Sequence, residues 1–206
     1  MSANVDIIGQ RVEWEQKPGL DTLSAICRAG KTCYKAANIK TKEKIETFIK
    51  GLIKRGHESV IEHSLASFRI ICSRGLMAEL TRHRLAQFSI ESTRYCNYNK
   101  KGFTVITPDW LGQGKAVATK AWIDGITNCF NTYDKLINEG IPPEYARGVL
   151  PLDLKTEIVM SANLREWRHI VKLRTSKEAH PQIQRLVNDI KNMFLDSAVS
   201  CVFEDL

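Results

Sequence analysis

Residues 65–84 read LASFRIICSRGLMAELTRHR and predict a strand, a cap and a helix in direct succession. Leu65–Cys72 is rich in β-branched and aromatic residues, which favour an extended strand. Ser73 then suits the N-cap of a helix beginning at Arg74, because its hydroxyl can accept a hydrogen bond from a free N–H of the first turn. We expect this helix to run to about Arg84 and to bury an apolar stripe. The stripe consists of Leu76, Met77 and Leu80.

Arg82, His83 and Arg84 would place three basic side chains in the last turn of that helix, where positive charge suits the helix dipole. Successive side chains on a helix point about 100° apart, so the three cannot face one ligand. A further cation, Arg94, follows ten residues later. Either the helix ends here or several ligands meet here.

The same reasoning extends to both sides of this stretch. An alternating start from Val5 to Val12 indicates a strand, and residues 103–106 and 156–162 indicate two more. Apolar spacing predicts amphipathic helices at 45–53, 117–137 and 183–194, a capped helix at 163–174 and a short helix at 142–147. Strands and helices that do not alternate strictly indicate an α+β fold, and we expect a single domain spanning residues 1–206.

Composition restricts the class of protein. The chain of 206 residues is 43% hydrophobic and 26% charged, as in ordinary globular proteins. Its six cysteines include no CxxC pair, and neither a leader segment nor a membrane-length apolar run is evident. We therefore expect free thiols, no membrane partner and a cytoplasmic location. The net charge of +7 favours anionic partners.

The arginines are the candidate anion ligands, because the sequence has neither GxGxxG nor GxxxxGK[ST] to cradle a phosphate. Guanidinium groups bind phosphate and carboxylate through a planar, permanently charged fork. A single arginine is more often a solvated surface residue, but their density around residue 82 leaves a ligand site and a surface role equally open. The candidates are Arg82, Arg84, Arg94, Arg147, Arg165 and Arg174.

Three other features have competing interpretations. GHESVIEH (56–63) contains His57 and His63 six residues apart, which does not fit the H-E-x-x-H zinc motif, so we interpret it as a turn and expect no metal site. Ser92 has no activating base nearby in sequence, so its expected role is a hydrogen bond to a phosphate. Glu79 either pairs with the basic residues one turn later or accepts a hydrogen bond from a ligand.

A nucleic-acid-binding module is a rival hypothesis. The sequence pI is about 9.1, and aromatic residues alternate with basic ones in TRYCNYNKKGF (93–103). Against it, basic residues occur throughout the chain, and no helix-turn-helix, zinc-finger or RNP pattern is present. We therefore expect no nucleic-acid partner.

The sequence resembles the flavin-dependent thymidylate synthases. The pattern RHR, seven residues and Ser, formed by residues 82–84 and Ser92 and followed by Arg94-Tyr95, is similar to the signature of that family. GHESVIEH (56–63) and SANLREWRHIVKLR (161–174) are also similar to family segments. Together the three stretches extend over residues 56–174.

The resemblance implies a fold, an activity and an assembly. It implies a central, mostly antiparallel sheet flanked by helices, and a homotetramer whose active sites are shared between subunits. The implied reaction is the reductive methylation of dUMP to dTMP, with 5,10-methylenetetrahydrofolate as carbon donor and NADPH as hydride donor through FAD. Tetrahydrofolate would be released, and the enzyme would be a methyltransferase with FAD as its cofactor.

The resemblance also implies roles for particular residues. Arg174 would be the catalytic cation that contacts the pyrimidine and favours its ionisation. Positions matching FAD contacts are His57, Ser59, Arg82, His83, Arg84, Ile90, Asn163, Leu164, Arg165 and His169. Positions matching dUMP contacts are Glu79, Leu80, Thr81, Arg82, Ile90, Glu91, Ser92, Thr93, Arg94, Arg147 and Arg174.

Three positions depart from the family pattern. Ser89 lies where many members have Asn, and Ile90 lies where Gln or Glu is common. A backbone contact survives at Ile90, but a side-chain hydrogen bond does not. Glu79 in place of Gln keeps an acceptor.

A relative that binds flavin but has lost methylation is a further alternative, which the joint presence of the five key residues opposes. These are Arg82, Ser92, Arg94, Arg147 and Arg174.

Overall fold

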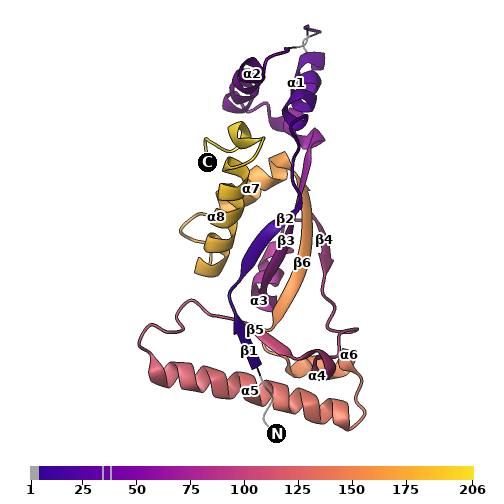
Figure 1. Ribbon diagram of the computed structural model, residues 1–206, viewed down its shortest axis with the longest axis vertical. Helices are drawn as coiled ribbons and strands as arrows, with labels where there is room; N and C mark the ends of the chain where they lie inside the picture. Colours follow the sequence, from indigo (N-terminus) through magenta and orange to yellow (C-terminus); the bar gives the residue numbers. More distant parts are fainter. Residues whose placement is uncertain (1–4, 34, 38) are drawn as a thin grey trace. The chain divides into compact units, whose positions relative to one another are not determined.

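A computed structural model describes residues 5–33, 35–37 and 39–206, and it confirms an α+β fold. Figure 1 shows the order of its elements along the chain. The strands are β1 (Val5–Ile8), β2 (Arg11–Gln16), β3 (Leu65–Ser73), β4 (Gln87–Ile90), β5 (Phe103–Ile106) and β6 (Lys155–Asn163). The α-helices are α1 (Thr22–Cys33), α2 (Lys42–Lys54), α3 (Arg74–Leu80), α4 (Tyr98–Lys101), α5 (Ala116–Asn138), α6 (Pro143–Ala146), α7 (Leu164–Arg174) and α8 (Pro181–Leu195). The 3₁₀ helices are η1 (Glu58–His63), η2 (Arg147–Val149) and η3 (Ser200–Val202).

The chain forms two compact units. Of the described residues, unit 1 comprises 5–11, 70–82 and 89–158, and unit 2 comprises 12–33, 35–37, 39–69, 83–88 and 159–206. One division between them falls after Arg82, in the turn between α3 and β4, and the others fall inside β2, β3, β4 and β6. These four strands form a mainly antiparallel sheet in the order β2-β3-β6-β4. The mostly antiparallel sheet is therefore confirmed, and the assignment of residues 1–206 to one domain stays a prediction.

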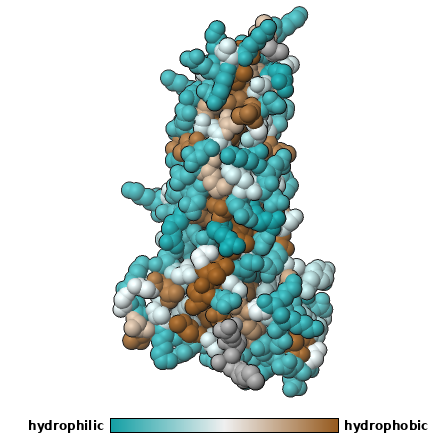
Figure 2. All heavy atoms as spheres, in the orientation of Figure 1, coloured by the Kyte–Doolittle hydropathy of each residue, from teal (hydrophilic) through white to brown (hydrophobic). Residues whose placement is uncertain are grey.

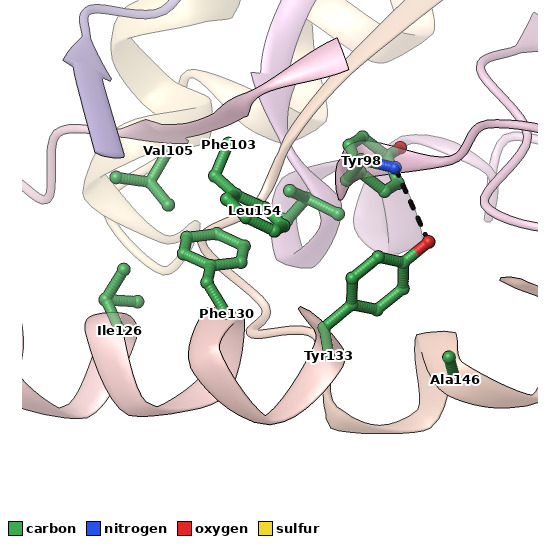
Figure 3. Packing of buried hydrophobic residues seen from close by; sticks show 8 residues of the cluster. All are labelled: Tyr98, Phe103, Val105, Ile126, Phe130, Tyr133, Ala146 and Leu154. Carbon is green, nitrogen blue, oxygen red and sulfur yellow. Dashed lines mark hydrogen bonds between the residues drawn. The ribbon is translucent and has the colours of Figure 1, made fainter. Parts of the chain in front are cut away.

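Unit 1 is built around the long helix α5 and a parallel pair of strands. β1 pairs with β5 from Val5 opposite Phe103 to Ile8 opposite Ile106. Phe130 of α5 stacks on Phe103 of β5 with ring centroids 4.2 Å apart (Figure 3). The cluster around them buries Tyr98, Val105, Ile126, Tyr133, Ala146 and Leu154. These contacts hold α4, α5 and β5 together.

Unit 2 has an aromatic core. Phe68 of β3 packs edge-on against Trp167 of α7 and Phe194 of α8, and Phe194 stacks on Phe203 with centroids 4.0 Å apart. The buried indole of Trp167 donates its N–H to the carbonyl of Ala66 at 2.9 Å, so its one polar group is satisfied. This core fixes α7, which carries several of the predicted site residues.

The capped helix predicted after Cys72 is confirmed at its start and wrong at its end. The Ser73 hydroxyl accepts a hydrogen bond from the N–H of Leu76 at 3.1 Å, as the sequence predicts. The helix ends at Leu80, however, and residues 82–84 lie in the turns that follow it. His83, three residues after Leu80, is buried against Arg174 and Glu166, and the chain leaves the helix before it.

Other elements also differ from the sequence prediction. The predicted opening strand is two strands, β1 and β2, separated at Gly9 and Gln10. Helix α1 and strand β4 were not predicted. The buried face of α1 includes Cys27 and Gly30, which weaken its apolar pattern, and β4 has only four residues.

The surface shows no membrane-spanning feature among the helices. None of the helices in the described part of the chain combines the length and apolar character that a bilayer crossing needs. On the face shown in Figure 2, apolar residues lie in small groups between polar ones. The six cysteines all lie within described residues and none is joined in a disulfide there.

Candidate active site

The predicted site residues divide between the two units. Unit 2 holds nearly all of the predicted FAD positions: His57, Ser59, His83, Arg84, Asn163, Leu164, Arg165 and His169. Unit 1 holds nearly all of the predicted dUMP positions: Glu79, Leu80, Thr81, Arg82, Ile90, Glu91, Ser92, Thr93, Arg94 and Arg147. Arg174 is the exception among the dUMP positions, because it lies in unit 2, and Arg82 and Ile90 are the exceptions among the FAD positions.

The basic triplet separates its side chains because it follows the helix and does not belong to it. Arg82 and Arg84 are exposed, whereas His83 is buried at 5% exposure. The division between the units falls between Arg82 and His83. The triplet therefore offers two solvent-facing cations on either side of an imidazole that is directed into unit 2.

His83 lies between a guanidinium and a carboxylate. The Nε of Arg174 donates a hydrogen bond to Nε2 of His83 at 3.0 Å, and Oε1 of Glu166 lies 3.6 Å from Nδ1. The ring of His169 lies edge-on, with its centroid 6.1 Å away. An imidazole nitrogen that accepts a hydrogen bond carries no proton, so His83 is neutral with its proton on Nδ1, facing Glu166.

The electrostatics of this cluster agree with a neutral imidazole. Burial, the charge of Arg174 and then His169 lower the pKa of His83 to about 4. Burial raises the pKa of Glu166, and His169 acts in the opposite direction. Shifted groups grouped in this way are characteristic of functional sites. Arg174 is therefore hydrogen-bonded to an uncharged side chain, and there is no repulsion between two neighbouring positive charges.

The same cluster is the one group in the described part of the chain with ligand atoms close enough to hold a metal ion. One such atom from each of His83, Glu166 and His169 lies within 4.8 Å of the others. Nε2 of His83 already accepts the hydrogen bond of Arg174, and a permanent positive charge beside this nitrogen opposes a metal cation. The arrangement suits an anionic ligand better. The predicted absence of a metal stays a prediction.

Unit 2 also contains a pocket of about 310 Å³ beside η1. Its lining includes three predicted FAD positions, His57, Ser59 and Arg165, which supply an imidazole, a hydroxyl and a guanidinium. These donors suit the phosphates of a dinucleotide. The residues present therefore fit a flavin nucleotide at its anionic part. GHESVIEH lies between α2 and β3, where a turn was predicted, and its residues Glu58–His63 form a 3₁₀ helix that was not predicted.

Arg165 does not face this pocket alone. Its guanidinium is hydrogen-bonded to Glu62 and lies 4.0 Å from Glu58. Glu58 also accepts a hydrogen bond from Arg168 at 3.3 Å, and Arg168 forms a two-pronged pair with Asp205 at 2.6 and 2.8 Å. Arg168 is itself buried, and the carboxylate of Asp205 lowers the cost of burying its charge. These ion pairs link η1, which lines the pocket, to α7 and to Asp205 near the end of the chain.

Asn163 and Leu164 have structural partners at the start of α7. Oδ1 of Asn163 accepts a hydrogen bond from the N–H of Glu166 at 2.8 Å, which confirms the predicted cap. Leu164 is fully buried, so its side chain belongs to the core. Its N–H donates to the carbonyl of Ser64 at 3.0 Å.

In unit 1, the segment after β4 gathers hydroxyls and arginines. Oγ of Ser92 accepts a hydrogen bond from the N–H of Arg94 at 3.2 Å, which closes a tight turn. Arg147 donates to the hydroxyl of Thr93 at 3.3 Å, and Arg94 lies 3.8 Å from the carboxylate of Glu144. Both arginines are exposed. Two hydroxyls and Arg94 in this segment, with Arg147 of η2 bonded to it, suit a phosphate.

The three predicted dUMP positions at the end of α3 differ in accessibility. The side chain of Leu80 is fully buried and Thr81 donates its hydroxyl to the carbonyl of Ala78 at 3.2 Å, whereas Glu79 is partly exposed. A contact of Leu80 with a ligand would therefore involve its backbone. The two interpretations of Glu79 remain open.

Sequence reasoning did not identify two positions on α1 that line the pocket of unit 2, Gly30 and Cys33. A side chain at Gly30 would meet the ring of Phe48 at 2.9 Å, so glycine permits the close approach of α1 to α2. No helix was predicted over this segment, so its two residues were not placed at a pocket. A wider depression of about 610 Å³ at the start of α5 contains none of the predicted site residues.

Comparison with known proteins shows which family this chain resembles over most of its length. Residues 20–198 match the family described as thymidylate synthase complementing protein. A flavin-dependent thymidylate synthase of Haloarcula marismortui is 32% identical over 178 residues, covering 75% of this chain and 72% of the relative. One of Geobacter sulfurreducens is 30% identical over 196 residues, covering 90% and 82%. A probable flavin-dependent thymidylate synthase of Mycobacterium phage D29 is 32% identical, covering 79% and 74%. With this match to the family pattern and to several of its members, the chain belongs to the flavin-dependent thymidylate synthases.

Proposed function

We propose that this chain converts dUMP to dTMP, taking a one-carbon unit from 5,10-methylenetetrahydrofolate and a hydride from NADPH through bound FAD, and releasing tetrahydrofolate. The observation that carries the proposal is the pairing of Arg174 with a buried, neutral His83. The family membership supports it independently.

The residues of unit 2 would hold FAD. His57, Ser59 and Arg165 line one pocket and present donors to the phosphates of the dinucleotide. When bound, the flavin supplies the transfer of reducing equivalents between NADPH and the substrate carbon. The task left to the chain is to bind, orient and exclude water.

The residues of unit 1 would hold the phosphate of dUMP. Arg94 and Arg147 are exposed and lie beside the hydroxyls of Ser92 and Thr93. Ser92 therefore acts as a hydrogen-bond partner and not as a nucleophile. Arg174 is the cation for the pyrimidine, where a fixed positive charge stabilises the anion formed by loss of the N3 proton.

The assembly and location follow the family expectation. We infer a homotetramer in which chains share active sites. We also infer a cytoplasmic location, and that neither nucleic acid nor a membrane is a partner. Because FAD, NADPH, folate and dUMP are all anions, the net charge of +7 suits these partners.

The visible spectrum of the purified protein tests the proposal. A flavin spectrum that bleaches with NADPH under anaerobic conditions and returns on adding dUMP with methylenetetrahydrofolate, with dTMP formed, is the expected result. A flavin spectrum without dTMP would support a relative that has lost methylation. Colourless protein that FAD cannot reconstitute would overturn the flavin assignment, and salt-sensitive retention of random DNA by that protein would favour the nucleic-acid hypothesis.

A further inference from the structure

Glu91 precedes the turn formed by Ser92 and Arg94, and both oxygens of its carboxylate have partners within unit 1. The hydroxyl of Tyr98 donates to Oε1 at 2.8 Å, and Nζ of Lys155 donates to Oε2 at 2.8 Å. The Glu91 and Lys155 side chains are only 20% and 23% exposed, so this pair is shielded from solvent more than a surface ion pair.

The two donors come from rigid elements. Tyr98 begins α4, is buried at 5% exposure and packs in the aromatic cluster of unit 1 (Figure 3). Burial and the adjacent Glu91 raise the pKa of Tyr98, so its hydroxyl keeps the proton that it donates. Lys155 opens β6, where it also lies 3.7 Å from Glu157.

The backbone of Glu91 is held as well. Nη1 of Arg74 donates to its carbonyl at 3.2 Å, and its N–H donates to the carbonyl of Glu157 at 2.9 Å. Arg74 also reaches the hydroxyl of the fully buried Thr156 at 3.4 Å. Side chain and backbone are therefore fixed by α3, α4 and β6 at the residue next to Ser92.

We propose that Glu91 is a positioning residue, and that Tyr98 and Lys155 act through it to hold the segment Ser92–Arg94 in the geometry that binds the phosphate of dUMP. The inference rests on the proposed function. A free carboxylate beside a phosphate would repel it, whereas a carboxylate held by Lys155 and Tyr98 is directed away and serves as an anchor. Glu91 then contributes to binding without contacting dUMP through its side chain.

Tyr98→Phe and Lys155→Met test this role by removing one donor each and keeping the packing of the ring or the stem. Calorimetry with dUMP on the FAD-loaded protein measures the effect. We expect dUMP to bind about tenfold more weakly, the usual effect of losing a hydrogen bond to a charged group. KM for dUMP should rise in parallel, with kcat at saturating dUMP and FAD content within about twofold of the wild type.

Two controls separate positioning from general destabilisation. Tyr133→Phe removes a hydroxyl from the same aromatic cluster, where it accepts the backbone N–H of Tyr98 at 3.4 Å and does not contact Glu91. It should lower Tm without weakening dUMP binding. Lys155→Arg keeps a charged donor and should restore most of the affinity that Lys155→Met loses.

The outcomes are distinguishable. Wild-type protein that loads FAD but binds no dUMP would contradict the proposed function, and the positioning role would fall with it. If the wild type binds dUMP and both Tyr98→Phe and Lys155→Met bind it equally well, the positioning role is overturned and the proposed function is not. Equal weakening by Tyr133→Phe would also overturn it, because the effect would then reflect loss of stability.

Discussion

A buried imidazole that accepts a hydrogen bond from an arginine is a poor base, but it can orient the guanidinium group. His83 has its proton on the side of Glu166, and its other nitrogen orients the guanidinium of Arg174. The arginine is thus oriented by a neutral group, which places no second positive charge beside it. Orientation of a cation before the substrate arrives is what electrostatic stabilisation requires.

Arg174→Ala should retain FAD and lose most turnover. Loss of one preorganised charge-stabilising group typically lowers kcat about 10²-fold or more. Flavin absorbance and dTMP formation measure the two effects separately. Lys172→Ala is a matched control, because it removes another positive charge from the last turn of α7. Turnover that is unchanged in Arg174→Ala would remove this residue from the chemistry.

The stability of the fold should decrease as the pH falls from about 6.5 to about 4. The pKa of His83 is lowered to about 4 in the folded chain, so in this window the unfolded chain binds a proton there and the folded chain does not. The free energy of unfolding therefore falls with pH, by at most about 1.4 kcal/mol per pH unit from this residue. The raised pKa of Glu166 acts in the opposite sense, because the folded chain protonates it first.

Urea unfolding of the wild type and of His83→Gln at several pH values isolates the contribution of His83. The stability advantage of the wild type over the variant should shrink between pH 6.5 and 4, because only the wild type has an imidazole to protonate on unfolding. Parallel stability curves for the two proteins would show that the pKa of His83 is not lowered.

Helix α3 depends on a single hydroxyl at its start. Ser73 is 4% exposed and its Oγ accepts the N–H of Leu76, so Ser73→Ala leaves that buried donor without its partner. We expect a loss of about 1 kcal/mol in the free energy of unfolding, and a Tm lower by about 2–4 °C. Calorimetry measures both. Ser73→Thr keeps the oxygen and should recover part of the loss, and equal losses in both variants would exclude the cap as the cause.

The sequence predicted elements whose pattern is local. The cap at Ser73, the strand before it and the cap at Asn163 were all predicted correctly, because a hydroxyl or amide before an apolar periodicity is a local signal. The end of α3 was predicted wrongly because the sequence of the basic triplet is compatible with a helix. What ends the helix is the burial of His83, which depends on Glu166 and Arg174, more than 80 residues away.

The candidate site shows the same division. The arginines of residues 82–94 were identified from their density and from the family pattern, whereas the partners of Glu91 were not. Lys155 and Tyr98 are distant from each other in sequence, and their donors meet one carboxylate only after β6 and α4 have folded. The α1 wall of the unit 2 pocket was missed because α1 itself was not predicted.

At the scale of the whole molecule, the proposed assembly is directly measurable. Light scattering on FAD-loaded protein should give a mass about four times that of the 23.4 kDa chain. The elution volume of the assembly on a size-exclusion column should not change with moderate salt if the contacts between chains are mainly apolar. A monomeric mass together with full turnover would overturn both the tetramer and the sharing of active sites between chains.

The division of the basic triplet between the two units has a consequence for mixed populations of chains. A lesion at Arg82 alters unit 1, and a lesion at Arg174 alters unit 2. If each active site combines the units of different chains, co-expression of the two inactive variants would regenerate some sites with both units intact. A cell carrying two defective copies of the gene could then make thymidylate, whereas either copy alone could not.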